Sequence, residues 1–176
     1  MTTIVNLLGS SGSSKSTTAM GLTYKLRLLG YKVEYVPEYA KDLVYEESEH
    51  KLKHQLYVFS KQLKRLDVLL GKGLDYVVTD SPLILSVFYG EKYNVNLPYF
   101  KELVLNSFKD QNQINFFLTR SLPFDTVGRL QSQEESDNDS LSLLNLLNTH
   151  QIKYIPLKGD NDAVNNILHF LSMSSL

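Results

Sequence analysis

The strongest constraint on the fold is a stretch near the N-terminus where an apolar run, a Gly/Ser-rich turn and an amphipathic helix follow one another. Residues 4–8 (IVNLL) predict a short buried strand, and residues 9–16 (GSSGSSKS) form the turn. The helix that follows places apolar residues on one face, namely Ala19, Leu22, Leu26 and Leu29. Backbone N–H groups of such a turn converge on phosphate groups, and the helix N-terminus adds partial positive charge. The stretch therefore predicts a phosphate-binding loop.

The turn matches the motif G-x-x-x-x-G-K-[ST] at every fixed position except the second glycine, where this chain has Ser14. A Cβ there crowds the place where the backbone comes closest to phosphate. A flexible Ser/Gly-rich linker is the alternative, but linkers do not normally join a buried strand to an amphipathic helix. We expect Lys15 to reach the β- and γ-phosphates and the Ser16 hydroxyl to ligate Mg²⁺. The residues expected to hold the nucleotide at this turn are Gly9, Ser11, Gly12, Ser13, Ser14, Lys15, Ser16 and Thr17.

Composition and charge predict one globular domain over residues 1–176 and exclude several other classes. Hydrophobic residues make up 43% and charged residues 21% of the chain, as in ordinary globular proteins. The net charge of -1 argues against gross electrostatic attachment to nucleic acid or acidic membrane, although it permits a local basic face. The absence of cysteine excludes disulfides and Cys-ligated zinc. Because the first strand begins at once and no apolar run approaches the ~18 residues of a membrane span, we expect a cytoplasmic protein without membrane contact.

The remainder of the chain alternates predicted strands and helices. This alternation predicts an α/β fold with a five-stranded parallel sheet flanked by helices on both faces. Residues 120–140 are polar and predict a mobile lid segment with some helix. The further strands are expected at 31–36, 76–79, 114–118 and 152–157, and the further helices at 38–45, 50–71, 98–108, 141–148 and from 161 to about Met173, with a helical turn at 83–89.

Polar side chains follow all five predicted strands at the point where each strand ends. In a parallel α/β sheet, ligands bind outside the carboxyl ends of the strands. The convergence of these side chains on one edge is therefore stronger support for a binding site than any single motif. They are Lys15 and Ser16 after the first strand, Glu38 after the second, Asp80 after the third, Arg120 after the fourth and Asp160 after the fifth.

Two of these residues are carboxylates with both a chemical and a structural interpretation. Asp80 ends an apolar strand, where a magnesium-associated carboxylate of a phosphate-loop enzyme belongs, or it caps the turn at residues 81–82. Glu38 lies near the expected γ-phosphate. It either accepts a proton from an acceptor hydroxyl or orients that hydroxyl, or it only complements the dipole of the helix at 38–45.

Arg120 and Arg129 flank a loop of the predicted lid that carries Pro123 and Gly128. Phosphoryl transfer spreads negative charge over the equatorial oxygens, and an arginine carried by a closing loop stabilises this charge. The alternative is that both are surface arginines that pair with nearby acids, namely Glu134, Glu135 or Asp137.

The predicted helix at 50–71 is basic away from its apolar stripe. A basic helix can follow a nucleic-acid backbone, but it is more commonly a solvated face. The basic residues are His50, Lys51, Lys53, His54, Lys61, Lys64 and Arg65.

Four stretches together resemble small P-loop kinases of the nucleoside/nucleotide kinase group, in particular virus-encoded proteins related to thymidylate and ribosylnicotinamide kinases. They are GSSGSSKST at 9–17, VPEYAKDLV at 36–44, VVTDSPLILS at 77–86 and the lid-like FLTRSLPFDTVGRLQSQEE at 117–135. The resemblance implies a single-domain P-loop NTPase fold, ATP as donor, a Mg²⁺ ion held by Ser16 and Asp80, and an acceptor near Glu38. It also implies that Gly159 and Asp160 border the adenine.

The resemblance leaves the acceptor open. Some viral members of the group are thought to phosphorylate hydroxymethylated pyrimidines such as 5-hydroxymethyluracil within DNA. Membership would imply DNA modification in the host cytoplasm, with DNA contacts through the basic helix at 50–71. The leading hypothesis is a kinase acting on a nucleoside- or nucleotide-type acceptor, free or within DNA. The alternatives are a regulatory P-loop NTPase switch and a nucleotide-binding protein without chemistry, and the oligomeric state stays open, a dimer included.

Overall fold

The computed structural model describes residues 1–95, 97–124 and 132–174, and within them five strands form one parallel sheet. The strand order is β2-β3-β1-β4-β5, so β1 lies at the centre, with Val5 opposite Val78 on one side and Ile114 on the other. A strand covered on both faces carries a continuous apolar run, which explains the composition of β1 and β3. The predicted fold class is confirmed. The strands are β1 Thr3–Leu8, β2 Val33–Val36, β3 Tyr76–Thr79, β4 Gln113–Arg120 and β5 Ile155–Gly159.

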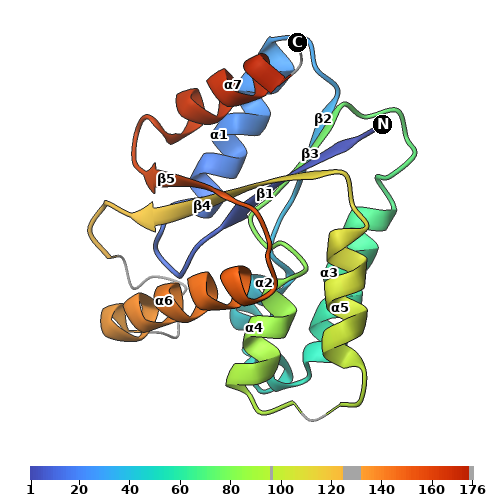
Figure 1. Cartoon of the computed structure of the whole chain (residues 1–176), viewed down its shortest axis with the longest axis vertical. Helices are drawn as coiled ribbons and strands as arrows, with labels where there is room; N and C mark the ends of the chain where they lie inside the picture. The colour runs from blue at the N-terminus through green and yellow to red at the C-terminus, as the bar shows by residue number, and fades with distance from the viewer. Residues whose placement is uncertain (96, 125–131, 175–176) are drawn as a thin grey trace.

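Helices cover both faces of the sheet, and each face has its own apolar core. Helices α1 and α7 lie side by side on one face and share one core cluster with the strands (Figure 1). Helices α3, α4, α5 and α6 contribute to a second cluster, whose largest fully buried side chains include Phe108 and Phe117. The helices are α1 Lys15–Leu28, α2 Tyr39–Tyr45, the 3₁₀ helix η1 Glu49–Lys53, α3 Gln55–Asp67, α4 Leu85–Lys92, α5 Phe100–Lys109, α6 Gln133–Thr149 and α7 Ala163–Ser174.

The prediction of one continuous helix over residues 50–71 is wrong. The segment contains η1 and α3, separated at His54, whose φ of -88° and ψ of 68° are not helical. Helix α3 ends at Asp67, and the apolar stripe is only partly buried because Leu56 is 48% exposed. In α1, Leu29 is likewise exposed, since the helix ends one residue earlier.

Helix α6 begins at Gln133, eight residues before the predicted start at 141. A capping box fixes this start: the Ser132 hydroxyl accepts from the N–H of Glu135 at 3.1 Å, and the Glu135 carboxylate accepts from the N–H of Ser132 at 2.7 Å. Residues 133–140 of the predicted lid are therefore helical, and residue 120 still belongs to β4. Residues 125–131 lie outside the described part of the chain.

Leu66 and Leu56 make a matched test of the core, because both are leucines on α3 and only Leu66 is fully buried. We expect Leu66→Ala to lower the free energy of unfolding by about 2–5 kcal/mol, through lost apolar contact and the cavity left behind. Leu56→Ala should change it by less than about 0.5 kcal/mol. Urea denaturation of the two variants measures the difference, and equal effects would contradict the burial of α3 described above.

Candidate functional site

The loop after β1 is packed so closely that two of its glycines cannot carry a side chain. A Cβ on Gly9, whose φ is +140°, would lie 2.5 Å from the carbonyl oxygen of Leu118 and 2.6 Å from Ser13 Oγ. A Cβ on Gly12, whose φ is +78°, would lie 2.9 Å from the ring of Phe124. Only glycine meets both the left-handed backbone and the close approach. The motif glycine Gly9, and Gly12 at one of the variable positions, thus have a structural cause.

One carbonyl group organises the polar side chains of this loop. The carbonyl oxygen of Ser10 accepts hydrogen bonds from Lys15 Nζ at 2.8 Å and from Ser13 Oγ at 2.9 Å. Lys15 therefore folds back over the loop instead of extending into solvent. A phosphate oxygen is a stronger acceptor for an ammonium group than a neutral carbonyl, so this position suits transfer of the Lys15 contact to a phosphate.

Ser14 stands where the motif has its second glycine, and its backbone conformation explains why glycine is expected there. It is the N-cap of α1 and has a left-handed backbone, with φ 63° and ψ 17°. Its carbonyl oxygen accepts the first hydrogen bond of the helix, from the N–H of Thr18 at 2.9 Å. The motif calls for glycine here because L-residues pay a steric cost in this conformation. The serine adopts the conformation nevertheless, so the loop keeps its path into α1.

The end of β5 lies directly against the loop. A Cβ on Gly159 would be only 2.3 Å from the carbonyl oxygen of Ser13. Gly159 is therefore beside the loop. Asp160 stabilises the turn before α7, because its Oδ1 accepts from the N–H of Asp162 at 3.0 Å. The expected closeness of both residues to an adenine stays a prediction.

One of the two residues predicted for Mg²⁺ contacts a tyrosine that the sequence did not single out. Asp80 is 2% exposed, and its Oδ2 accepts from the hydroxyl of Tyr35 at 2.8 Å. Burial and the neighbouring Asp80 carboxylate raise the pKa of Tyr35 far above its usual range, and the nearby Ser16 hydroxyl opposes this shift. The alternation of polar and apolar residues at 31–36 gave no signal for such a contact.

Asp80 has one oxygen to spare for a ligand. Its Oδ1 is buried and has no hydrogen-bond partner among the residues that the structure describes. The capping alternative for Asp80 finds no support, because Oδ2 accepts from Tyr35 and Oδ1 accepts from no N–H group of the described residues. Magnesium takes hard oxygen ligands, commonly one or two from protein and the others from phosphates and water. Ser16 and Asp80 fit such a donor set, and the described segments contain no group of three or more His, Cys, Asp or Glu that suits a metal ion.

Glu38 lies at the end of β2 and has an unusual electrostatic environment. Burial raises the pKa of its carboxyl group above the usual 4.5, Lys15 acts in the opposite direction and Asp80 adds to the rise. Glu38 is the N-cap residue of α2, yet its side chain makes no capping hydrogen bond. The N–H of Tyr39 is instead bonded to the side-chain oxygen of Gln62 at 2.9 Å. The helix-capping interpretation of Glu38 therefore loses its main support.

Arg120 lies at the end of β4, close to the loop and mostly buried. Its guanidinium pairs with Asp137 of α6 and lies 5.2 Å from the ring centroid of Phe124, and its side chain is 13% exposed. Its Cδ would be 3.6 Å from a Cβ on Gly12. Pairing with Asp137 was one of the alternatives predicted, but the side chain is not a solvated one. Arg129 lies outside the described residues.

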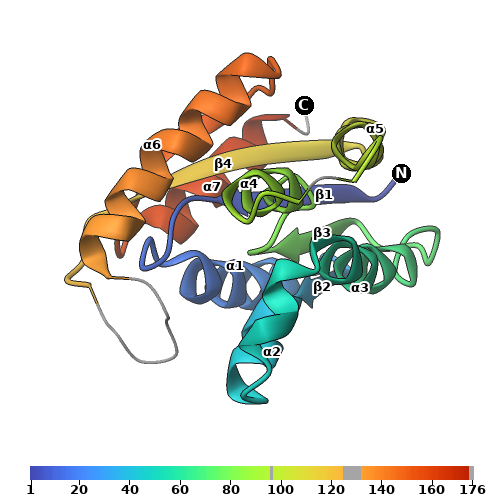
Figure 2. The ribbon, with the colours of Figure 1, turned by 90° about the horizontal axis from the view of Figure 1, so that it is seen from below.

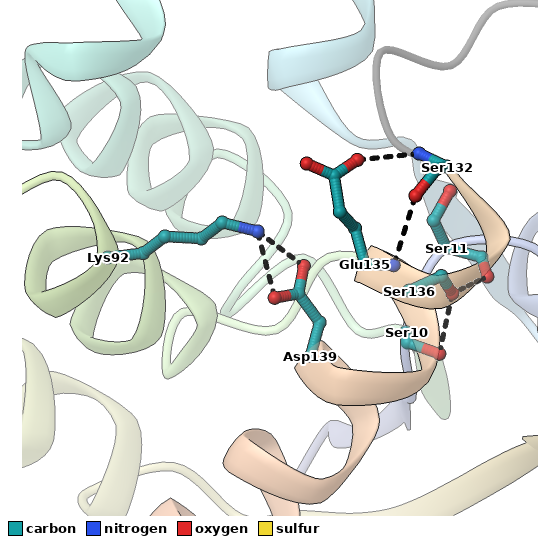
Figure 3. Close-up of polar contacts among 7 residues, drawn as sticks. All are labelled: Ser10, Ser11, Lys92, Ser132, Glu135, Ser136 and Asp139. Carbon is teal, nitrogen blue, oxygen red and sulfur yellow. Dashed lines mark hydrogen bonds and ion pairs between the residues drawn. The ribbon is translucent and has the colours of Figure 1, made fainter.

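Helix α6 is tied to the loop by a residue that the sequence analysis missed. The Ser136 hydroxyl donates to the carbonyl oxygen of Ser11 at 2.6 Å and lies 3.1 Å from Ser10 Oγ (Figure 3). Figure 2 shows the start of α6 beside the loop that joins β1 to α1. One turn further along, Asp139 pairs with Lys92 of α4 (Figure 3). The S-x-x-E pattern at 132–135 was the available signal for this arrangement.

Not all of the basic side chains predicted for nucleic-acid contact face solvent. Arg65 pairs with Asp42, donates to the carbonyl oxygen of Pro37 at 3.0 Å and lies over the Tyr39 ring. It is therefore a structural residue of the corner between β2 and α2. Other basic residues open onto a groove of about 800 Å³, lined by Lys51, Lys53, His54, Gln55, Leu56, Tyr57, Tyr93, Asn94, Val95 and Leu97.

The groove adjoins the Glu38 end of the site through a pair of tyrosines. The hydroxyl groups of Tyr57 and Tyr39 are 2.7 Å apart, and Tyr39 directly follows Glu38. No carboxylate is among the residues that line the groove in the described part of the chain.

Replacing Ser14 by glycine should stabilise the protein and strengthen nucleotide binding. Ser14→Gly removes the steric cost of the left-handed backbone, which we expect to raise the free energy of unfolding by up to about 1 kcal/mol, and removes a Cβ near the phosphate position. Gln151→Gly is the control, since Gln151 also has positive φ (54°) but lies after α6. Calorimetric titration with an ATP analogue should show tighter binding for Ser14→Gly alone. Equal affinity in both variants would contradict a role for residue 14 in phosphate contact.

The raised pKa of Glu38 predicts how stability depends on pH. The folded protein holds this proton more tightly than the unfolded chain, so the contribution is fully present below about pH 4.5 and is lost as pH rises through the folded pKa. Glu38→Gln should remove this part of the pH dependence. Urea denaturation between pH 4 and 8 measures it, with Glu102→Gln on the exposed side of α5 as control. Parallel pH curves for wild type and Glu38→Gln would contradict the prediction.

Comparison with solved structures confirms a P-loop NTPase fold. The chain superposes on a crystal structure of NadR protein in complex with NR, with a TM-score of 0.69 and 15% identity over 96% of this chain and 51% of that one. For NadR protein in complex with NAD and AMP-PNP, the TM-score is 0.66 and the identity 15%, over 98% of this chain and 49% of the other. The chain thus spans about half the length of these structures, and similarity at this identity shows the fold alone.

Among the described residues, none of the helices has the length and apolar character that a bilayer crossing requires.

Two further comparisons concern sequence. No curated protein sequence matches the chain. The model of the AAA domain family, in contrast, matches residues 4–163, from the first strand with its phosphate loop to the start of α7. This match covers most of the chain, and the protein therefore belongs to the AAA domain family.

Proposed function

We propose that the protein is a phosphotransferase that moves the γ-phosphate of ATP onto a hydroxyl group of a nucleoside- or nucleotide-type acceptor. The observation that carries the proposal is the arrangement at one sheet edge, where Lys15 and Ser16 of the loop lie with Asp80 and Glu38. The solved structures of similar fold are those of a protein bound to NR, and to NAD with AMP-PNP. Their ligands support a nucleotide donor and a nucleoside-type acceptor for this chain.

The donor side of the proposal rests on the loop and its neighbours. Backbone N–H groups of residues 9–17 and the ammonium group of Lys15 would hold the phosphates, and Ser16 and Asp80 would hold Mg²⁺. The bound ion would neutralise charge on the β- and γ-phosphates. Because the loop is already in its packed conformation, little reorganisation is needed when a phosphate binds, and preorganised donors are the main source of rate in this chemistry.

Glu38 is the proposed acceptor-side carboxylate. Burial raises the pKa of its carboxyl group, and a base works best when its pKa is closer to the operating pH. In its ionised form Glu38 would orient the acceptor hydroxyl or accept its proton, while the neighbouring Lys15 holds the phosphates. Its lack of a capping role leaves the carboxylate available for this task.

Arg120 is the proposed transition-state arginine. One nitrogen, Nη2, pairs with Asp137, while Nη1 is buried without a hydrogen-bond partner among the described residues. A buried donor without an acceptor costs about 1–3 kcal/mol, and a phosphoryl oxygen near Gly12 would satisfy it. Arg129 is proposed as a second arginine on sequence grounds alone.

For the acceptor we propose a nucleobase-containing hydroxyl compound, with a hydroxymethylated pyrimidine such as 5-hydroxymethyluracil in DNA as its most specific form. The basic and aromatic residues of the groove beside Tyr57 support a phosphate-bearing acceptor, since cations with interleaved aromatic rings suit a nucleic-acid strand. A base within duplex DNA would have to leave the stack to reach the γ-phosphate.

A second function is favoured by one specific contact. Ser136 bonds α6 directly to the phosphate loop. A conformational change of the loop would therefore be passed to helix α6, as a regulatory NTPase switch requires. A switch would hydrolyse ATP at a rate that no acceptor alters, whereas a kinase transfers phosphate to the acceptor.

Transfer of labelled γ-phosphate to a panel of acceptors separates these functions. The panel contains nucleosides, nucleoside monophosphates, ribosylnicotinamide, and DNA with or without hydroxymethyl pyrimidines. We expect transfer to one class, and a loss of about 100-fold or more in Lys15→Ala, the size typical for removing one charge-stabilising donor. Lys25→Ala, an exposed lysine on α1, is the matched control. Transfer undiminished in Lys15→Ala would refute the site, and ATP hydrolysis indifferent to every acceptor would favour the switch.

A further inference from the structure

Tyr35 joins three elements at the point where Mg²⁺ is expected. It lies on β2, its ring packs against the core shared with α1, and its hydroxyl group donates to Asp80 directly after β3 and lies near Ser16 at the start of α1. Neither the motif nor the family match assigns it a task. It is half-buried, and the contact with Asp80 is a well-formed hydrogen bond of 2.8 Å.

The direction of this hydrogen bond follows from the chemistry of the groups. An ionised carboxylate only accepts, so the hydrogen of the Tyr35 hydroxyl goes to Asp80 Oδ2.

This direction determines what remains for a cation. Asp80 has Oδ2 occupied and Oδ1 buried without a partner in the described segments, so Oδ1 is the oxygen left for a cation or a water bound to it. Partners of this kind, which hold metal ligands in place, commonly contribute 10- to 100-fold to metal affinity.

We propose that Tyr35 is the positioning residue of the Mg²⁺ site, acting through Asp80 to leave the second oxygen of that carboxylate for the ion. The inference rests on the proposed function only in requiring that a nucleotide and Mg²⁺ bind at the loop. It does not require any transfer to an acceptor. A structural role alone would make Tyr35 matter for folding but not for the metal.

The test compares nucleotide binding with and without the metal. The affinity of the full chain for AMP-PNP is measured by calorimetry in EDTA and in saturating Mg²⁺, and the ratio of the two affinities reports the coupling between metal and nucleotide. Tyr35→Phe keeps the ring and removes the hydroxyl group. We expect the ratio to fall by about tenfold or more, while affinity in EDTA stays unchanged. Tyr24→Phe, an exposed tyrosine on α1, should behave as wild type.

A double variant shows whether Tyr35 acts through Asp80. If it does, Tyr35→Phe should cause little further loss in an Asp80→Asn background, because the two effects are not additive. Two results would overturn the proposal: a Tyr35→Phe ratio equal to that of wild type, including the case in which affinity falls equally in EDTA and in Mg²⁺, or full additivity with Asp80→Asn. A wild-type chain that binds AMP-PNP but transfers no phosphate would refute the kinase alone, whereas one that binds no nucleotide would overturn both.

Discussion

The close packing of the loop backbone between β1 and α1 is the constraint on which the site depends. Gly9 lies against the carbonyl of Leu118, Gly159 against the carbonyl of Ser13, and Ser136 donates to the carbonyl of Ser11. These contacts come from β4, β5 and α6, elements far apart in the sequence. A loop held on several sides by backbone contacts cannot relax when a phosphate arrives, which is the property that electrostatic preorganisation requires.

The charges of the site are arranged in pairs across this loop. Lys15 lies on the Ser10 carbonyl and is near enough to Glu38 to oppose the rise in its pKa. Arg120 is balanced by Asp137, and Asp80 by the Tyr35 hydroxyl. Each of these charged groups has a neutral or oppositely charged neighbour, while Oδ1 of Asp80 and Nη1 of Arg120 have no hydrogen-bond partner among the described residues. The site is therefore electrostatically satisfied in part before any ligand binds, which limits the cost of keeping these groups partly buried.

The sequence predicts what local patterns control. The order of strands and helices followed from hydrophobic periodicity, and the phosphate loop from a spacing of glycine, lysine and serine that has a direct physical cause. The break at His54 was missed because the apolar residues around it keep helical spacing, although its backbone is not helical. Tyr35 and Ser136 were missed because their partners lie on other elements, so that only the tertiary structure brings them to the loop.

Glu38 and Arg120 show a further limit of sequence patterns. Each was predicted to lie at a strand end, and each does. Neither the lack of a capping bond at Glu38 nor the burial of Arg120 is visible in the sequence, because both depend on what packs around the side chain. For Glu38 the capping bond is absent because the side-chain oxygen of Gln62 accepts the N–H of Tyr39 at the start of α2.

The departure at Ser14 finds its explanation in the same packing. A left-handed serine costs roughly 1–2 kcal/mol relative to a relaxed backbone, a sizeable share of the 5–15 kcal/mol that typically separates folded from unfolded states. The cost is tolerated because residues on both sides are fixed independently: Ser13 by the Ser10 carbonyl and Gly159, and the first turn of α1 by the bond from Thr18 to the Ser14 carbonyl. The glycine of the motif therefore reflects a required backbone conformation. A chain that enforces this conformation from its neighbours keeps the loop geometry without the glycine.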